Sequence, residues 1–128
     1  MKLLLFACAG GALGAGARYV VGVGVVRLLG AAVGFPWATL CVNIVGSFLM
    51  GLFIESLALR GSSSTELRVF IAVGVLGGFT TFSAFSLEFM MLMQRKEELA
   101  AGLYVVSSVT LSILALYLGL VLARQVLA

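Results

Sequence analysis

The sequence predicts an all-α integral membrane protein, one domain over residues 1–128 with four transmembrane helices, and three observations indicate this fold class. First, 62% of the 128 residues are hydrophobic and 10% are charged, whereas soluble domains are about 45–50% apolar. Second, the apolar residues form four runs, each close to the ~20 residues that a helix needs to cross a bilayer. Third, the segments between these runs are too short to be further domains.

The spans are separated by short polar connections. We predict spans at about 3–26, 37–59, 69–93 and 99–122, joined by residues 27–36, 60–68 and 94–98. The first apolar run continues well past Ala7-Cys8-Ala9, which looks faintly like a cleavage site. We therefore interpret this run as a span and not as a signal peptide.

The residue types argue against an enzyme. The chain has no histidine, and its two cysteines, Cys8 and Cys41, lie apart in apolar runs. It therefore lacks a ligand set for zinc or iron and an imidazole base for hydrolysis. A disulfide between the cysteines stays possible.

Positive charge is balanced between the two predicted faces. An even number of spans puts both termini on one face, which also carries Lys2, Arg60, Arg68 and Arg124. The opposite face carries Arg27, Arg95 and Lys96, and Arg18 makes the balance four against four. Because Lys/Arg bias in the loops sets orientation, this tie predicts insertion in both directions and an antiparallel, dual-topology homodimer.

The first span carries Gly10, Gly14 and Arg18 at spacings of four, which places them on one helix face. We interpret the glycines as a packing face, because small residues let helices approach closely in a membrane. Arg18 has two interpretations: its guanidinium reaches the membrane interface, or it faces a wet vestibule and gathers anions.

The second and fourth spans each carry a polar stripe at spacings of four. The stripes are Thr39, Asn43 and Ser47 in the second span, and Tyr104, Ser108 and Ser112 in the fourth. Asn43 is either a bond between helices or a donor to a passing ligand. The serines could bond only their own backbone, and Tyr104 could belong to an interfacial aromatic belt.

The third span contains Gly74, Gly77 and Gly78 directly before Thr80-Thr81. Glycine weakens a helix interior, so we predict that the third helix is broken near its middle, at Gly77. Carbonyls freed by such a break can hold an alkali cation, and the start of the helix resuming near Phe82 favours an anion.

Phenylalanines follow the glycines at helical spacing. Phe79, Phe82 and Phe85 are three residues apart, so we expect them to share a face with Phe89. The rings either pack in the core or present their positive edges to an anion. Since the first span has no acid and Glu88 is the carboxylate well inside the later spans, a small hydrogen-bonding anion fits better than an organic cation.

These residues carry a resemblance to a known family. The segments GGALGAGARY at 10–19, TLCVNIVGSF at 39–48 and GGFTTFSAFS at 77–86 are similar to those of the Fluc (CrcB) fluoride channels, and the third segment is the most specific. The resemblance implies an antiparallel homodimer with two pores that passively releases cytoplasmic fluoride. A visible departure is Ala84, where many relatives have threonine.

The resemblance also implies site residues and surroundings. The implied fluoride pathway consists of Asn43, Phe82, Phe85, Thr39, Tyr104, Ser108 and Ser112, with Arg18 in the vestibule. The backbone carbonyls of Gly77 and Thr80 from both copies would hold a central, structural, non-permeating Na⁺, while the role of Glu88 stays open. The expected location is a prokaryotic inner (plasma) membrane, and the expected partners are fluoride, membrane lipid and a second copy, without nucleic acid.

Two other functions compete with a fluoride channel. A small multidrug exporter also has four helices and dual topology, but it depends on a membrane-embedded glutamate in the first helix, which this sequence lacks. A membrane assembly factor without transport activity would explain the packing glycines but not the polar stripes.

Overall fold

The computed structural model describes residues 1–30, 34–61 and 64–128. Its helices are α1 (Lys2–Leu29), α2 (Trp37–Arg60), α3 (Thr65–Arg68), η1 (Val69–Leu76), α4 (Gly77–Phe79), α5 (Ser83–Gln94) and α6 (Glu98–Leu127). Within these described residues, four helical segments are long and apolar enough to cross a membrane, and the third of them runs over Thr65–Gln94 from α3 to α5. The prediction of four spans is confirmed.

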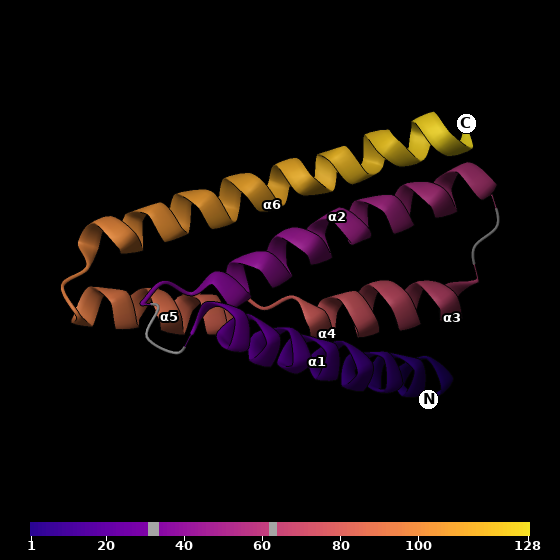
Figure 1. Cartoon of the computed structure of the whole chain (residues 1–128). Helices are drawn as coiled ribbons and strands as arrows, with labels where there is room; N and C mark the ends of the chain where they lie inside the picture. The colour runs from indigo at the N-terminus through magenta and orange to yellow at the C-terminus, as the bar shows by residue number, and fades with distance from the viewer. Residues whose placement is uncertain (31–33, 62–63) are drawn as a thin grey trace.

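The helix axes lie roughly parallel to one another, and successive spans run in opposite directions (Figure 1). Both termini lie at one end of the bundle, together with the end of α2 and the start of α3. The end of α1, the start of α2 and the turn between α5 and α6 lie at the opposite end. We call these the terminal end and the loop end.

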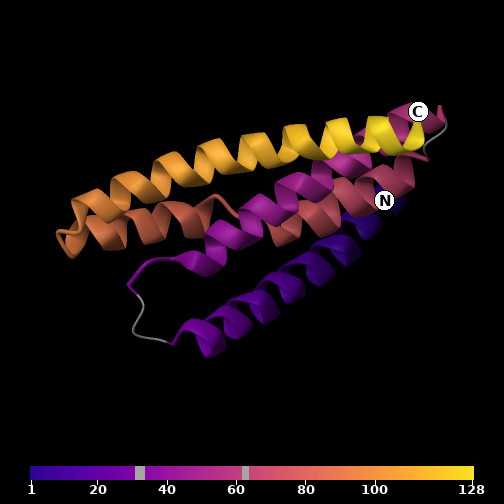
Figure 2. The ribbon, with the colours of Figure 1, turned by 45° about the horizontal axis from the view of Figure 1, so that its top comes forward.

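The bundle contains two close helix pairs, α1 against η1 and α4, and α2 against α6 (Figure 2). A methyl group at Gly10 or Gly14 would collide with backbone oxygens of η1, and Gly51 and Gly119 are just as close to the backbone across the α2–α6 contact. Close approach of this kind holds helices together where lipid provides no hydrophobic drive. The predicted packing role of Gly10 and Gly14 is confirmed.

The third span is interrupted between α4 and α5, and not at the glycine pair. Gly77 keeps helical angles (φ −65°, ψ −36°), whereas Thr80 is extended (φ −77°, ψ 158°) and α5 begins at Ser83. Gly78 has another role, because an added Cβ would lie 2.7 Å from the Gly11 carbonyl oxygen of α1. The predicted position at Gly77 was therefore wrong by about one helical turn.

The interruption also changes the aromatic face. Phe79 ends α4, so helical spacing no longer relates it to Phe82 and Phe85, and its ring lies against Gly46 of α2. Phe82 and Phe85 do lie together, with ring centroids 5.4 Å apart. The expectation that Phe79 shares their face was wrong.

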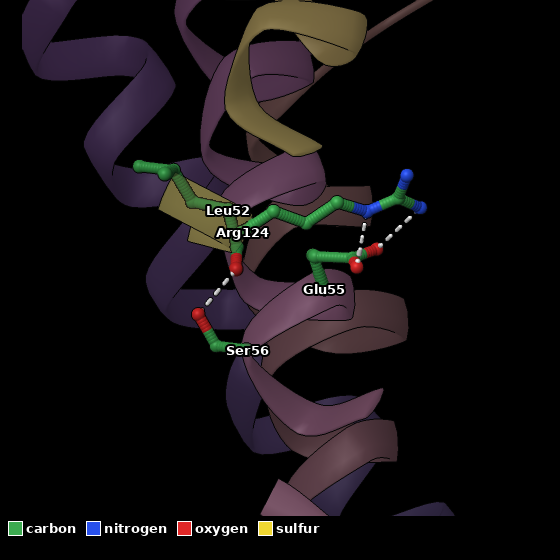
Figure 3. A network of polar contacts seen from close by, with 4 residues as sticks. All are labelled: Leu52, Glu55, Ser56 and Arg124. Atoms are coloured by element: carbon green, nitrogen blue, oxygen red, sulfur yellow. Dashed lines mark hydrogen bonds and ion pairs between the residues drawn. The ribbon is translucent and has the colours of Figure 1, made fainter. Parts of the chain in front are cut away.

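At the terminal end, Arg124 of α6 binds Glu55 of α2 (Figure 3). Its Nε donates to Glu55 Oε1 at 2.6 Å and its Nη2 to Oε2 at 3.4 Å, and the Glu55 side chain is only 12% exposed. The hydroxyl of the neighbouring Ser56 donates to the Leu52 carbonyl, one turn earlier in the same helix. The ion pair therefore adds an electrostatic contact to the close packing of α2 and α6 at their glycines.

Candidate functional site

A cavity of about 500 Å³, here called the first cavity, lies between α2, the interruption and α6. Eight residues singled out from the sequence line it: Asn43, Ser47, Gly77, Thr80, Phe82, Phe85, Ser108 and Ser112. No charged side chain lines this cavity in the part of the chain that the structure describes. The fold thus brings parts of the stripes from three spans around one uncharged space with both polar and apolar lining residues.

Asn43 joins α2 to the interruption through both atoms of its amide. Its Nδ2 donates to the Thr81 carbonyl at 3.0 Å, and its Oδ1 accepts from the Thr81 N–H at 2.9 Å. The sequence left open whether Asn43 bonds another helix or faces a ligand, and the structure shows the bond. An amide nitrogen carries two hydrogens, so one N–H of this cavity-lining residue is left for a ligand.

The interruption releases several backbone carbonyls from helical pairing, among them those of Gly77 and Thr80. The Thr81 N–H donates to Asn43 in place of the Gly77 carbonyl, four residues earlier. The Ala84 N–H donates to Thr81 Oγ1 at 3.2 Å in place of the Thr80 carbonyl. Carbonyls released in this way inside a membrane span need protein, water or an ion as a partner.

Arg18 supplies a partner for one of these carbonyls. Its Nη1 donates to the Thr80 oxygen at 3.2 Å. The guanidinium is thus directed toward the interruption, and Arg18 also lines the second cavity described below. The contact also ties α1 to the third span.

Two serine hydroxyls of α6 face the site without a partner. The Oγ atoms of Ser108 and Ser112 are buried, and neither forms a hydrogen bond within the described residues. Ser107 differs, because its hydroxyl donates to the Tyr104 carbonyl at 3.3 Å. A buried hydroxyl left unpaired costs about 1–3 kcal/mol. Two such hydroxyls in one cavity therefore indicate a place for a ligand or water.

Phe82 and Phe85 form the aromatic side of the first cavity. Phe85 is 9% exposed, while Phe82 is 77% exposed on the surface of the single chain. Their ring planes are tilted by 41° to each other, and the edges of aromatic rings carry positive potential. A ring edge that faces the cavity can attract an anion without a fixed charge.

A second polar cluster is centred on Glu88 of α5. Thr39 Oγ1 donates to Glu88 Oε1 at 2.8 Å, and the Tyr104 hydroxyl donates to Oε2 at 2.6 Å. Tyr104 is 0% exposed, so its interpretation as an interfacial belt residue was wrong. The sequence singled out Glu88 as an intramembrane acid, but nothing in the spacing showed that Thr39 and Tyr104 would meet it.

A second cavity of about 540 Å³ lies between α1, α2 and α5. Arg18, Arg27, Thr39 and Glu88 are among its lining residues. Thr39 thus opens onto this space and not onto the first cavity with Asn43 and Ser47. The two arginines outnumber Glu88, so the lining carries an excess of positive charge, which raises the local concentration of anions as expected of a vestibule.

The chain is similar to known proteins over nearly its whole length. The family model described as "CrcB-like protein, Camphor Resistance (CrcB)" matches residues 5–120. A protein of Chelativorans sp. (strain BNC1), named "Fluoride-specific ion channel FluC", is 53% identical over 127 residues, covering 99% of this chain and 100% of the relative. Relatives with the same name occur in Mesorhizobium japonicum, at 52% identity over 95% of this chain and 96% of the relative, and in Caulobacter vibrioides (strain NA1000 / CB15N), at 51% over 100% of both.

Proposed function

The chain belongs to the Fluc (CrcB) family of fluoride ion channels, and from this premise we propose that it is a fluoride-selective channel that passively exports cytoplasmic fluoride. Its relatives are named as ion channels, not enzymes, and it is a multi-pass membrane protein by its four apolar helices. The bacterial sources of the relatives support a location in a prokaryotic inner (plasma) membrane.

One observation carries the proposal: the buried, unpartnered hydroxyls of Ser108 and Ser112 belong to residues that line one cavity together with Asn43, Phe82 and Phe85. Hydroxyl and amide hydrogens and the edges of aromatic rings offer positive potential, and none of these side chains carries a charge. A small anion that accepts strong hydrogen bonds would satisfy the hydroxyls, while the rings exclude bulk water. Fluoride has this chemistry.

The proposed pathway continues toward the loop end through the Glu88 cluster. Thr39 and Tyr104, whose hydroxyls donate to Glu88, would neutralise this carboxylate beside the pathway and so lower its repulsion of the anion. Arg18, which lines the second cavity, would gather anions in the vestibule.

We propose further that two copies form an antiparallel homodimer with two pores. The first cavity opens on the surface of the single chain at Phe82, where a bilayer would place acyl chains against polar groups at considerable cost. A second copy would cover this opening, and a two-fold axis would repeat the pathway. A reporter fused to the C-terminus should appear on both sides of the membrane; its appearance on one side only would contradict the dual topology.

A structural Na⁺ is compatible with the backbone at the interruption. The carbonyls of Gly77 and Thr80 are released from helical pairing, and unwound carbonyls are the ligands that membrane proteins offer to Na⁺. The Thr80 oxygen accepts from Arg18 but has a second lone pair. In the dimer, both copies would contribute these carbonyls, and the ion would supply a fixed positive charge that holds the interruptions together. Na⁺ should then raise thermal stability more than K⁺ does; equal stabilisation would contradict this site.

The proposed function is tested by removing the two unpartnered hydroxyls. We expect Ser108→Ala with Ser112→Ala to slow fluoride efflux from proteoliposomes, because the anion loses its donors along α6. Ser107→Ala is the matched control, since that hydroxyl already bonds its own backbone. Equal efflux from both variants would contradict a pathway along this face.

A further inference from the structure

The ring of Tyr104 is in contact with a residue that lies outside the transmembrane helices. Phe35 precedes α2 at the loop end, and its ring centroid is 5.6 Å from that of Tyr104, with the planes nearly perpendicular at 82°. Phe85 lies 5.0 Å from the same ring, and Glu88 accepts the hydroxyl at 2.6 Å. Two rings and one carboxylate therefore define where the tyrosine lies.

Phe35 is itself held by its neighbours. Its ring centroid lies 4.6 Å from that of Trp37, and the backbone N–H of Trp37 donates to the Phe35 carbonyl at 2.9 Å. Pro36 restricts the backbone of the residue before it to extended angles. The backbone of Phe35 is thus fixed relative to the first turn of α2.

A second contact ties this segment to the turn between α5 and α6. Arg95 Nη2 donates to the Gly34 carbonyl, and Arg95 Nε lies 3.3 Å from Glu97 Oε1. Gly34 lies beside both side chains, since an added Cβ would be 3.6 Å from Arg95 Nη2 and 3.7 Å from Glu97 Oε2. The segment that carries Phe35 is therefore attached to the turn that precedes α6, the helix that contains Tyr104.

We propose that Phe35 is a positioning residue for Tyr104, and that Arg95, through the Gly34 carbonyl, keeps Phe35 in place. Without the Phe35 ring, Tyr104 can rotate away from Glu88, and the half-buried carboxylate then keeps the Thr39 hydroxyl as its one side-chain donor among the described residues. A carboxylate that is less neutralised repels an anion more strongly. The consequence for fluoride flux rests on the proposed function, whereas the position of Tyr104 does not.

The position of Tyr104 can be measured directly because the chain has three tyrosines. In a background with Tyr19→Phe and Tyr117→Phe, the resonance Raman doublet of tyrosine reports the hydrogen bond of the Tyr104 hydroxyl alone. Phe35→Ala should shift the doublet toward a weaker donor. The matched control is Phe6→Ala, which removes a similar edge-to-face contact, with Phe70 at 6.3 Å and 80°.

A double-mutant cycle tests whether Phe35 acts through this hydroxyl. We expect Phe35→Ala to slow fluoride efflux by about two- to tenfold, the range that one aromatic pair implies, and to add little in a Tyr104→Phe background. An unchanged doublet in Phe35→Ala, an equal shift in Phe6→Ala, or additive slowing in the cycle would overturn the inference. Absence of fluoride efflux in the unmodified protein would instead contradict the proposed function, and the doublet would still decide the position of Tyr104.

Discussion

Asn43→Leu perturbs the site at the point where α2 meets the interruption. Leucine has a similar size but removes both hydrogen bonds to Thr81, at 3.0 and 2.9 Å. Bonds between membrane helices contribute about 0.6–2 kcal/mol each, so the loss is about 1–4 kcal/mol. The freed Thr81 N–H can then pair with the Gly77 carbonyl, which closes the interruption toward a continuous helix. We therefore expect both lower stability and much slower fluoride efflux.

The measurements are thermal unfolding in detergent and fluoride-electrode recordings of efflux from proteoliposomes. A loss of about 3 kcal/mol would change the ratio of interrupted to closed conformations by about a hundredfold. Cys41→Leu is the matched control, because it introduces the same residue on α2 at an exposed, free cysteine. If Asn43→Leu unfolds and conducts like Cys41→Leu, the role of this amide in holding the interruption is refuted.

Three further predictions follow from other contacts. Phe82→Ile with Phe85→Ile should greatly slow fluoride efflux while size-exclusion chromatography shows an intact dimer; unchanged efflux would assign the rings to packing alone. Gly14→Ala should lower stability by about 1–3 kcal/mol, because the methyl collides with η1 and α4, whereas Gly16→Ala enters open space and should not destabilise; thermal unfolding of both decides. Tyr104→Phe should lower the free energy of unfolding by about 1.5–3 kcal/mol, because the hydrogen bond to Glu88 is lost. An unfolding temperature equal to that of the wild-type protein would contradict this prediction.

The four spans were predictable because composition and run length reflect the thickness of a bilayer. The polar stripes were predictable because spacings of four place residues on one helix face. Ser108 and Ser112 illustrate this, since both line the first cavity. A pattern along one helix does not depend on where the other helices lie, which is why these features could be inferred from the sequence.

The position of the interruption could not be predicted in this way. Glycine weakens a helix and also allows close helix packing, and spacing alone does not distinguish these roles at Gly77 and Gly78. The interruption depends on Asn43, which is 38 residues from Thr81 in the chain. A partner this distant supplies no local signal.

The Glu88 cluster was missed for the same reason. Thr39 and Tyr104 each belong to a predicted stripe, but their common acceptor is a carboxylate 49 and 16 residues away, respectively. The period of a stripe shows which residues share a face, and only the packing of the helices shows what that face meets. The disulfide left open between Cys8 and Cys41 is likewise decided by the fold, which leaves both residues free.

The central claim, selective passive transport of fluoride, is tested most directly by comparing fluoride and chloride efflux from proteoliposomes that contain the unmodified protein. The neutral, hydrogen-bonding first cavity predicts rapid loss of fluoride down its gradient and retention of chloride. Equal efflux of the two anions, or no efflux of fluoride, would contradict the account.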